Sequence, residues 1–181
     1  MTRSYPDTVA GPYEPPPRTF TDRDGRELVV RSLDEGPVGD DIEALVTMYE
    51  GYDPGDRAQG IPPAGERRIR DWLDNITAED CHNVVAWHDD WPAGHATLVP
   101  DRHGACELAI FVDGDYQNAG IGTQLMEALL GYGREQGIER VWLTVERWNE
   151  PAIALYHKVG FDRTGDGNFE LEMTARLVAA D

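Results

Sequence analysis

The chain has 181 residues, a length that indicates one domain, and its 40% of apolar residues can form a core. It contains no apolar run of about 18 residues and no signal-peptide pattern at its start, so we expect a soluble cytoplasmic protein. Its two cysteines, Cys81 and Cys106, are too few and too widely spaced for a disulfide scaffold.

Acidic residues outnumber basic ones by 34 to 16, which gives a formal net charge of −18. Lys158 is the only lysine, and no basic cluster is present, so duplex nucleic acid and anionic membranes are excluded as partners. Because the acids are spread over the whole chain, we expect a halophilic protein whose self-repulsion is screened by salt. The alternative is an acidic surface that recruits a cationic partner.

The first half of the chain begins with a proline-rich segment. Five of the twelve prolines lie in residues 1–24, which predicts an extended N-terminal arm before a domain at 25–181. A strand at 28–31 follows, and then a helix that Asp40 or Asp41 can cap. Residues 51–65 carry three prolines and four glycines, which predicts a loop.

The rest of the chain shows regular periodicity with clear breaks. The expected elements are a helix at 67–76, strands at 83–87, 94–99 and 106–112, a helix at 120–136, a strand at 140–145, a helix from Asn149 to Gly160, and a hairpin of 161–163 with 168–174. The order β-α-α-β-β-β-α-β-α-β-β indicates a mixed α/β domain.

A strand runs into a glycine-bearing turn and then a strong helix near Gly120 and Gly122. The first N–H groups of a helix have no internal partner and carry partial positive charge, so this turn favours an anion site. A Walker loop is excluded because the segment has no lysine, and the dinucleotide fingerprint is excluded because its third glycine is replaced by Leu125. An ordinary strand-to-helix turn remains the alternative.

A second segment supplies the decisive resemblance. Asn149, Ala152, Leu155, Tyr156, Lys158, Gly160 and Phe161 match the pattern Asn-x-x-Ala-x-x-Leu-Tyr-x-Lys-x-Gly-Phe. This pattern resembles the signature of the GNAT N-acetyltransferase superfamily, and Gln117-x-x-Gly120-x-Gly122 resembles that family's acyl-CoA pyrophosphate loop. The resemblance implies a mixed, mostly antiparallel sheet of about six to seven strands flanked by about four helices, with a splayed-strand acyl-CoA cleft.

The resemblance also implies the residues that would hold acetyl-CoA. Phe111 and Val112 would pair with the pantetheine arm along a free strand edge. Asn149 would bind the same arm, and Tyr156 would lie near the sulfur atom and protonate the thiolate that leaves. The pyrophosphate would be held by the loop residues Gln117, Asn118, Ala119, Gly120, Ile121, Gly122 and Thr123.

The implied activity is transfer of an acetyl group from acetyl-CoA to a primary amine by direct attack, with no metal. Glu107 is the candidate general base, because the resemblance implies a glutamate on this strand beside the cleft. Partial desolvation beside the apolar residues Leu108, Ala109 and Ile110 can raise its pKa toward a useful value. A surface role for Glu107 and a core role for Tyr156 are the alternatives. Asn149 is in any case a good helix cap, and Cys106 is expected to be buried.

Two positions of the predicted pyrophosphate loop depart from the family pattern. Asn118 stands where the family often has glycine, but asparagine tolerates left-handed backbone, so the turn is expected to survive. Ala119 stands where lysine or arginine is frequent, which removes a possible phosphate contact.

The acceptor is a protein lysine or N-terminus, or a small cationic amine, and its pocket is expected to include Tyr49, Tyr52 and Asp53. A homodimer is possible, and the alternative function is a catalytically inactive CoA-binding regulatory module.

Overall fold

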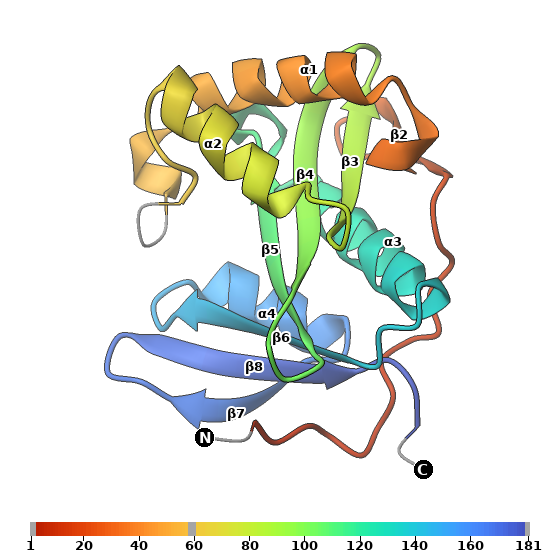
Figure 1. Ribbon diagram of the computed structural model, residues 1–181, viewed down its shortest axis with the longest axis vertical. Coiled ribbons are helices and arrows are strands. Elements are labelled where there is room, and N and C mark those ends of the chain that lie inside the picture. The colour runs from red at the N-terminus through yellow and green to blue at the C-terminus, as the bar shows by residue number, and fades with distance from the viewer. Residues whose placement is uncertain (1–2, 58–60, 180–181) are drawn as a thin grey trace.

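The computed structural model describes residues 3–57 and 61–179 (Figure 1). Within these ranges it contains one eight-stranded sheet in the order β1-β2-β3-β4-β5-β6-β8-β7 and four α-helices. The strands are β1 (Arg18–Thr21), β2 (Glu27–Ser32), β3 (His82–His88), β4 (Trp91–Pro100), β5 (Cys106–Val112), β6 (Arg140–Glu146), β7 (Asp162–Asp166) and β8 (Glu170–Arg176). The helices are α1 (Val38–Glu50), α2 (Glu66–Ile76), α3 (Ile121–Glu135) and α4 (Glu150–Lys158), with short 3-10 turns η1 (Leu33–Glu35), η2 (Pro54–Asp56) and η3 (Gly114–Tyr116).

The expected mixed α/β architecture and element order are confirmed, with one strand more than expected. The additional strand is β1, which pairs antiparallel with β2 and lies inside the proline-rich segment. The sequence analysis assigned these residues to the proline-rich arm. The prolines end at Pro17, and the alternating residues Arg-Thr-Phe-Thr that form the strand follow directly. Part of the expected loop, residues 58–60, lies outside the described residues.

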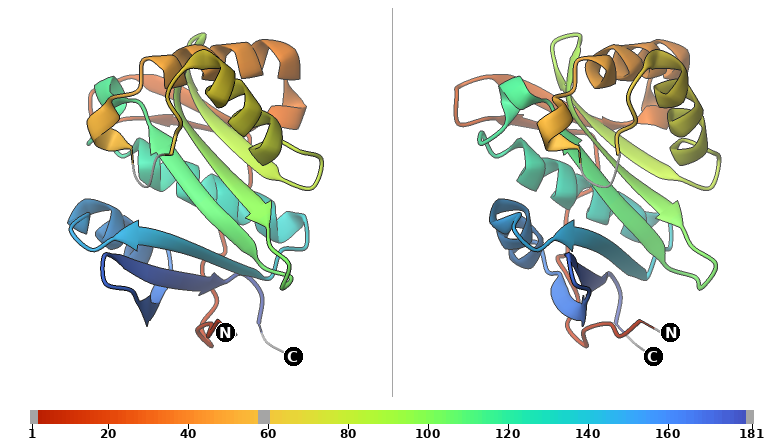
Figure 2. Two further views of the ribbon diagram at one scale, coloured as in Figure 1. Left: turned by 60° about the vertical axis from the view of Figure 1, so that its left-hand side comes forward. Right: turned by 90° about the vertical axis from the view of Figure 1, so that its left-hand side faces the viewer.

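Helices cover both faces of the sheet (Figures 1 and 2). On one face α1 and α2 enclose a cluster that includes Leu45, Tyr49, Leu73 and Phe111. On the other face α3 and α4 pack over a larger core, whose residues come from every strand from β2 to β6 and from β8. Within the described residues, no helix is long and apolar enough to cross a membrane.

The expected cap of α1 is wrong. The helix begins at Val38, so both Asp40 and Asp41 lie in its first turn, where a negative charge interacts favourably with the helix dipole. Asp41 is buried and accepts two hydrogen bonds from Arg31 of β2, at 2.6 and 2.8 Å. A buried carboxylate needs such a partner, which explains why this aspartate faces the sheet and does not cap the helix.

The segment before β1 lies against the domain. Ala10 N–H donates to the Arg176 carbonyl at 2.8 Å, and the Tyr13 hydroxyl donates to the Val159 carbonyl at 3.1 Å. The backbone of this segment passes so close to α3 that a Cβ at Gly131 would lie 2.6 Å from the Tyr13 carbonyl oxygen. The boundary at residue 24 stays a prediction, but residues 3–17 are held by the sheet and by α3.

Candidate functional site

The sheet opens between β5 and β6. In the described chain these parallel strands pair at Cys106↔Val141 and Glu107↔Trp142, and then diverge (Figures 1 and 2). Strand β5 stays paired with β4 along its whole length, so one edge of its outer half faces the opening. Phe111 and Val112 lie in this outer half. The structure therefore contains the splayed pair of strands that the resemblance implies.

The loop after β5 leads to the N-terminus of α3 at the open end of the splay. Asn118 and Gly120 adopt positive φ values of 60° and 90°, so the expected left-handed turn is present at Asn118. Among the described residues no side chain caps α3, and its first turn contains no acidic residue. The first N–H groups of this helix are therefore available to an anionic group.

The seven loop residues differ in what they can offer. The side chains of Ala119 and Ile121 are buried in the core, so only their backbone can contact a ligand. The side chain of Gln117 donates to the Asp56 carboxylate at 3.0 Å and to the Val112 carbonyl at 3.2 Å. Asn118, Gly120, Gly122 and Thr123 complete the turn and the start of the helix.

One residue near this loop was missed by the sequence analysis. A methyl group at Gly120 would lie 3.9 Å from Nε of Arg23, which belongs to the turn between β1 and β2. That turn is fixed to the loop, because Arg23 N–H donates to the Ala119 carbonyl at 3.0 Å and Arg26 donates to the Asp115 carbonyl at 3.1 Å. Arg23 thus brings a guanidinium close to the place where Ala119 lacks a basic side chain.

The start of α4 lies on the other side of the opening. Asn149 is the N-cap of this helix and accepts the Ala152 N–H at 3.3 Å, as expected. A Cβ at Gly122 would lie 3.2 Å from the Leu155 side chain, which shows how closely α3 approaches α4. The predicted pyrophosphate loop therefore leads into a helix that packs against α4, the helix that Asn149 caps.

Two tyrosines flank this opening from opposite sides. Tyr156 of α4 is buried, and burial raises its pKa to about 12. Tyr52, directly after α1, is also buried, and burial together with the Asp56 carboxylate raises its pKa to about 12. A charge on Tyr156 would raise the pKa of Tyr52 further, whereas the Val112 N–H lowers it. At neutral pH both groups are neutral phenols that can donate a proton.

Glu107 lies at the vertex where β5 and β6 diverge. It is on the same face of β5 as Phe111 and Ala109, which pack against the α1–α2 side. Its side chain contacts solvent, yet partial burial raises the pKa of its carboxyl, with Arg3 lowering it and Asp101 raising it. Cys106 points to the other face and is buried, as expected, and burial raises the pKa of its thiol to about 11.

The residues expected around the acceptor are only partly brought together. Tyr49 is fully buried and its hydroxyl lies 2.7 Å from Nδ1 of His95, so it is a core residue and does not line a pocket. Asp53 caps η2 by accepting the Gly55 N–H at 2.7 Å. Tyr52 is the member of this set that lies beside the splay.

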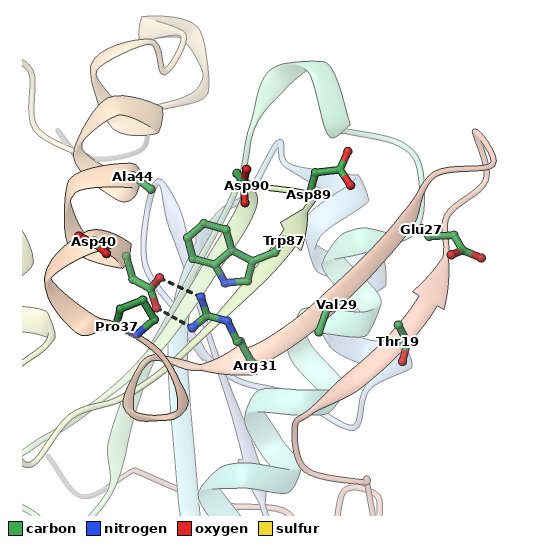
Figure 3. A pocket seen from close by; sticks show the side chains of 11 residues that line it. Thr19, Glu27, Val29, Arg31, Pro37, Asp40, Ala44, Trp87, Asp89 and Asp90 are labelled. Atoms are coloured by element: carbon green, nitrogen blue, oxygen red, sulfur yellow. Dashed lines mark hydrogen bonds and ion pairs between the residues drawn. The ribbon is translucent and has the colours of Figure 1, made fainter.

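A separate pocket of about 670 Å³ lies between α1 and strands β1 to β3 (Figure 3). Arg31 pairs with Asp41 there, and its guanidinium lies over the Trp87 ring at 4.8 Å. None of the predicted catalytic or CoA-binding residues lines this pocket. Within residues 3–57 and 61–179, no group of three or more His, Cys, Asp or Glu side chains could hold a metal ion.

Comparison with known proteins assigns the chain to a family. The family described as acetyltransferase (GNAT) matches residues 43–161, which is more than half of the chain. The chain belongs to the GNAT acetyltransferase family. This family uses acetyl-CoA as the acetyl donor. The matched residues include the splayed strands β5 and β6, the loop before α3, and helix α4, which are therefore parts of a GNAT domain.

Two relatives of known name are similar to this GNAT chain. The mycothiol acetyltransferase of Propionibacterium freudenreichii subsp. shermanii is 28% identical over 132 residues, which cover 67% of this chain and 40% of that protein. The ribosomal protein bS18-alanine N-acetyltransferase of Escherichia coli K12 is 43% identical over 53 residues, which cover 29% of this chain and 36% of that protein. The chain thus spans less than half the length of these relatives.

Two solved structures share the fold. The GNAT domain of S. lividans PAT has a TM-score of 0.73 and 19% identity, covering 88% of this chain and 96% of that chain. The protein yncA of Salmonella typhimurium, solved with its cofactor acetyl-CoA, has a TM-score of 0.64 and 19% identity, covering 83% and 94%. These similarities support the mixed α/β sheet and its helices as a GNAT fold.

Proposed function

We propose that this chain transfers the acetyl group of acetyl-CoA to a primary amine. The observation that carries the proposal is the divergence of β5 and β6, which has a glutamate at its vertex and an uncapped helix N-terminus at its open end. Acyl-CoA fits this arrangement because its pyrophosphate needs N–H donors and its pantetheine amides need a free strand edge.

Different parts of the chain would bind different parts of acetyl-CoA. The loop from Gln117 to Thr123 would hold the pyrophosphate, with Arg23 beside it. The edge of β5 at Phe111 and Val112 would face the pantetheine arm, which would replace the Gln117 side chain at the Val112 carbonyl, with Asn149 across the opening. This geometry would bring the thioester between Tyr156 and the vertex of the splay.

The chemistry would then proceed by direct attack. Glu107, directly or through a water molecule, would take a proton from the acceptor ammonium, and the nitrogen lone pair would form a C–N bond to the thioester carbon. Backbone N–H groups of the outer half of β5 would stabilise the negative charge on the carbonyl oxygen. As the C–S bond breaks, the neutral phenol of Tyr156 would give its proton to the thiolate. The nitrogen would release its second proton through solvent to the tyrosinate, which leaves a neutral amide, a free thiol and the phenol.

The acceptor class is proposed as a protein N-terminus, a lysine side chain or a small cationic amine. The names of the two relatives differ, since one refers to mycothiol and the other to an alanine of ribosomal protein bS18. The Glu107 carboxylate at the vertex favours an amine that arrives protonated, whereas the nearby Asp101 and Glu172 carboxylates are paired with Arg3.

Labelled acetyl-CoA tests the proposal with a peptide that begins with alanine, a lysine peptide and a polyamine as acceptors. We expect transfer to at least one of them and a loss of about 10²-fold or more in kcat for Glu107→Gln. Glu135→Gln, a change at the exposed end of α3, is the matched control and should keep full activity. Tight binding of acetyl-CoA without transfer to any amine would contradict the proposal and support a regulatory CoA-binding module.

A further inference from the structure

The N-terminal segment reaches the vertex of the splay through Arg3. The centre of its guanidinium lies 3.5 Å from the centroid of the Trp142 ring, and Trp142 is the register partner of Glu107. Its Nε donates to the Glu172 carboxylate at 2.9 Å, and its Nη1 lies 3.4 Å from the Asp101 carboxylate. With three such contacts, the position of this guanidinium is well defined.

The segment behind Arg3 is held along β8. The Thr174 hydroxyl donates to the Ser4 carbonyl at 2.9 Å, and Arg176 Nε donates to the Pro6 carbonyl at 3.0 Å. Thr174 is the register partner of Trp142, so the segment crosses the sheet on the same face as Glu107. The sheet therefore fixes the cation where the candidate base lies.

The charges at this corner come from several elements. Arg3 is the cation that lowers the pKa of Glu107, whereas burial and the Asp101 carboxylate raise it. Glu172 of β8 binds Arg3, and Asp101 also accepts the Trp142 indole N–H at 3.0 Å. Arg140 of β6 lies 5.4 Å from the Tyr5 ring, whose pKa is raised mainly by burial.

We propose that Arg3 is a positioning residue of the acetyl transfer, which keeps a positive charge beside Glu107 so that this carboxylate is ionised before the acceptor arrives. Without Arg3 the carboxylates of Asp101 and Glu172 would lose their ion-pair partner beside Glu107, with His103 left as a neighbour of Asp101, which favours a protonated Glu107. The N-terminal segment would then be part of the active site. This inference rests on the proposed function, because it assigns Glu107 the role of base.

The test compares Arg3→Gln and Arg3→Lys in the full chain, with any tag placed at the C-terminus. For Arg3→Gln we expect the acid limb of kcat/KM to move to higher pH by about 0.5 unit at 0.1 M salt, because a neighbouring cation is lost. Arg3→Lys should return the acid limb of kcat/KM to the pH at which it lies in the unchanged chain. A structural role predicts the opposite sign, since loosening the segment would expose Glu107 to water and lower its pKa.

Arg176→Gln is the matched control, because it removes an anchor of the same segment without removing the charge beside Glu107. Its acid limb should match that of the unchanged chain. A limb that does not move in Arg3→Gln, or moves to lower pH, overturns the inference. NMR titration of the Glu107 carboxyl gives the same comparison without turnover, so failure of the inference is distinguishable from absence of acetyl transfer.

Discussion

His95 should make the folded chain less stable as the pH falls from 7 to 5. This histidine is fully buried on β4, with Nδ1 2.7 Å from the Tyr49 hydroxyl and Nε2 2.7 Å from Oδ1 of Asn83. The amide oxygen can only accept, so Nε2 carries the proton and Nδ1 accepts from Tyr49. Both ring nitrogens are satisfied by the neutral imidazole, and a second proton on Nδ1 would remove the acceptor of the hydrogen bond that the Tyr49 hydroxyl donates.

The magnitude follows from the two pKa values of this group. Burial lowers the pKa of His95 to about 3 in the folded chain, against about 6.5 in the unfolded chain. Between these values the unfolded chain binds one proton more, so stability is complete above about pH 6.5 and is lost as the pH falls. From pH 7 to 5 the loss is about 2 kcal/mol, or roughly 4–8 °C in Tm for a domain of this size.

Urea unfolding at pH 7, 6 and 5 in 1 M KCl measures this loss, with the high salt reducing changes in general charge repulsion. In His95→Gln the dependence on pH should largely disappear. His82→Gln is the control, because His82 is only partly buried, although burial lowers its pKa in the same direction. The reasoning is refuted if His95→Gln keeps the slope of the unchanged chain, or if that chain is equally stable at pH 5 and 7.

Two further predictions concern the proposed acyl-CoA site. Arg23→Ala should raise the KM for acetyl-CoA about 5-fold with little change in kcat, because it removes a cation beside the loop but no reacting group. Arg18→Ala, which removes an ion pair with Glu127 on α3, should leave KM unchanged, and equal effects of both changes would argue against a phosphate contact. Tyr156→Phe should lower kcat about 10²-fold at neutral pH without changing the affinity for acetyl-CoA measured by calorimetry, and an unchanged kcat would exclude Tyr156 as the proton donor.

Local patterns were sufficient for most of the fold. The motif from Asn149 to Phe161 predicted a capped helix, and the structure shows its cap at Asn149 and a left-handed residue at Gly160. The turn at Asn118 was also predictable, because asparagine is one of the few residues that adopt positive φ at low cost. In each case the signal lies within a few residues of the structure that it determines.

Contacts between distant segments were not predictable in this way. Arg23 lies beside Gly120 and Arg3 beside Trp142 only after the sheet has formed, and no spacing in a single sequence indicates either pair. Tyr49 was misassigned for a related reason. Its position on an apolar helix face near a loop is compatible with a pocket wall, and only the structure shows its hydroxyl directed inward to His95.

The net charge of −18 does not by itself oppose the proposed anion binding at the loop, because two nearby carboxylates, those of Asp113 and Asp22, are bound to protein groups. Asp113 accepts from the Asp115 N–H at 3.2 Å and from the Trp91 indole at 2.8 Å, and Asp22 accepts from Arg26 at 2.7 Å. These contacts turn the two carboxylates toward other groups of the protein, whereas the first N–H groups of α3 have no side-chain cap within the described residues. The electrostatic potential at a bound ligand depends mainly on the groups that face it at short distance. At this loop the orientation of the N–H donors therefore matters more than the net charge of the chain. The acid-rich composition and the proposed pyrophosphate site are therefore compatible.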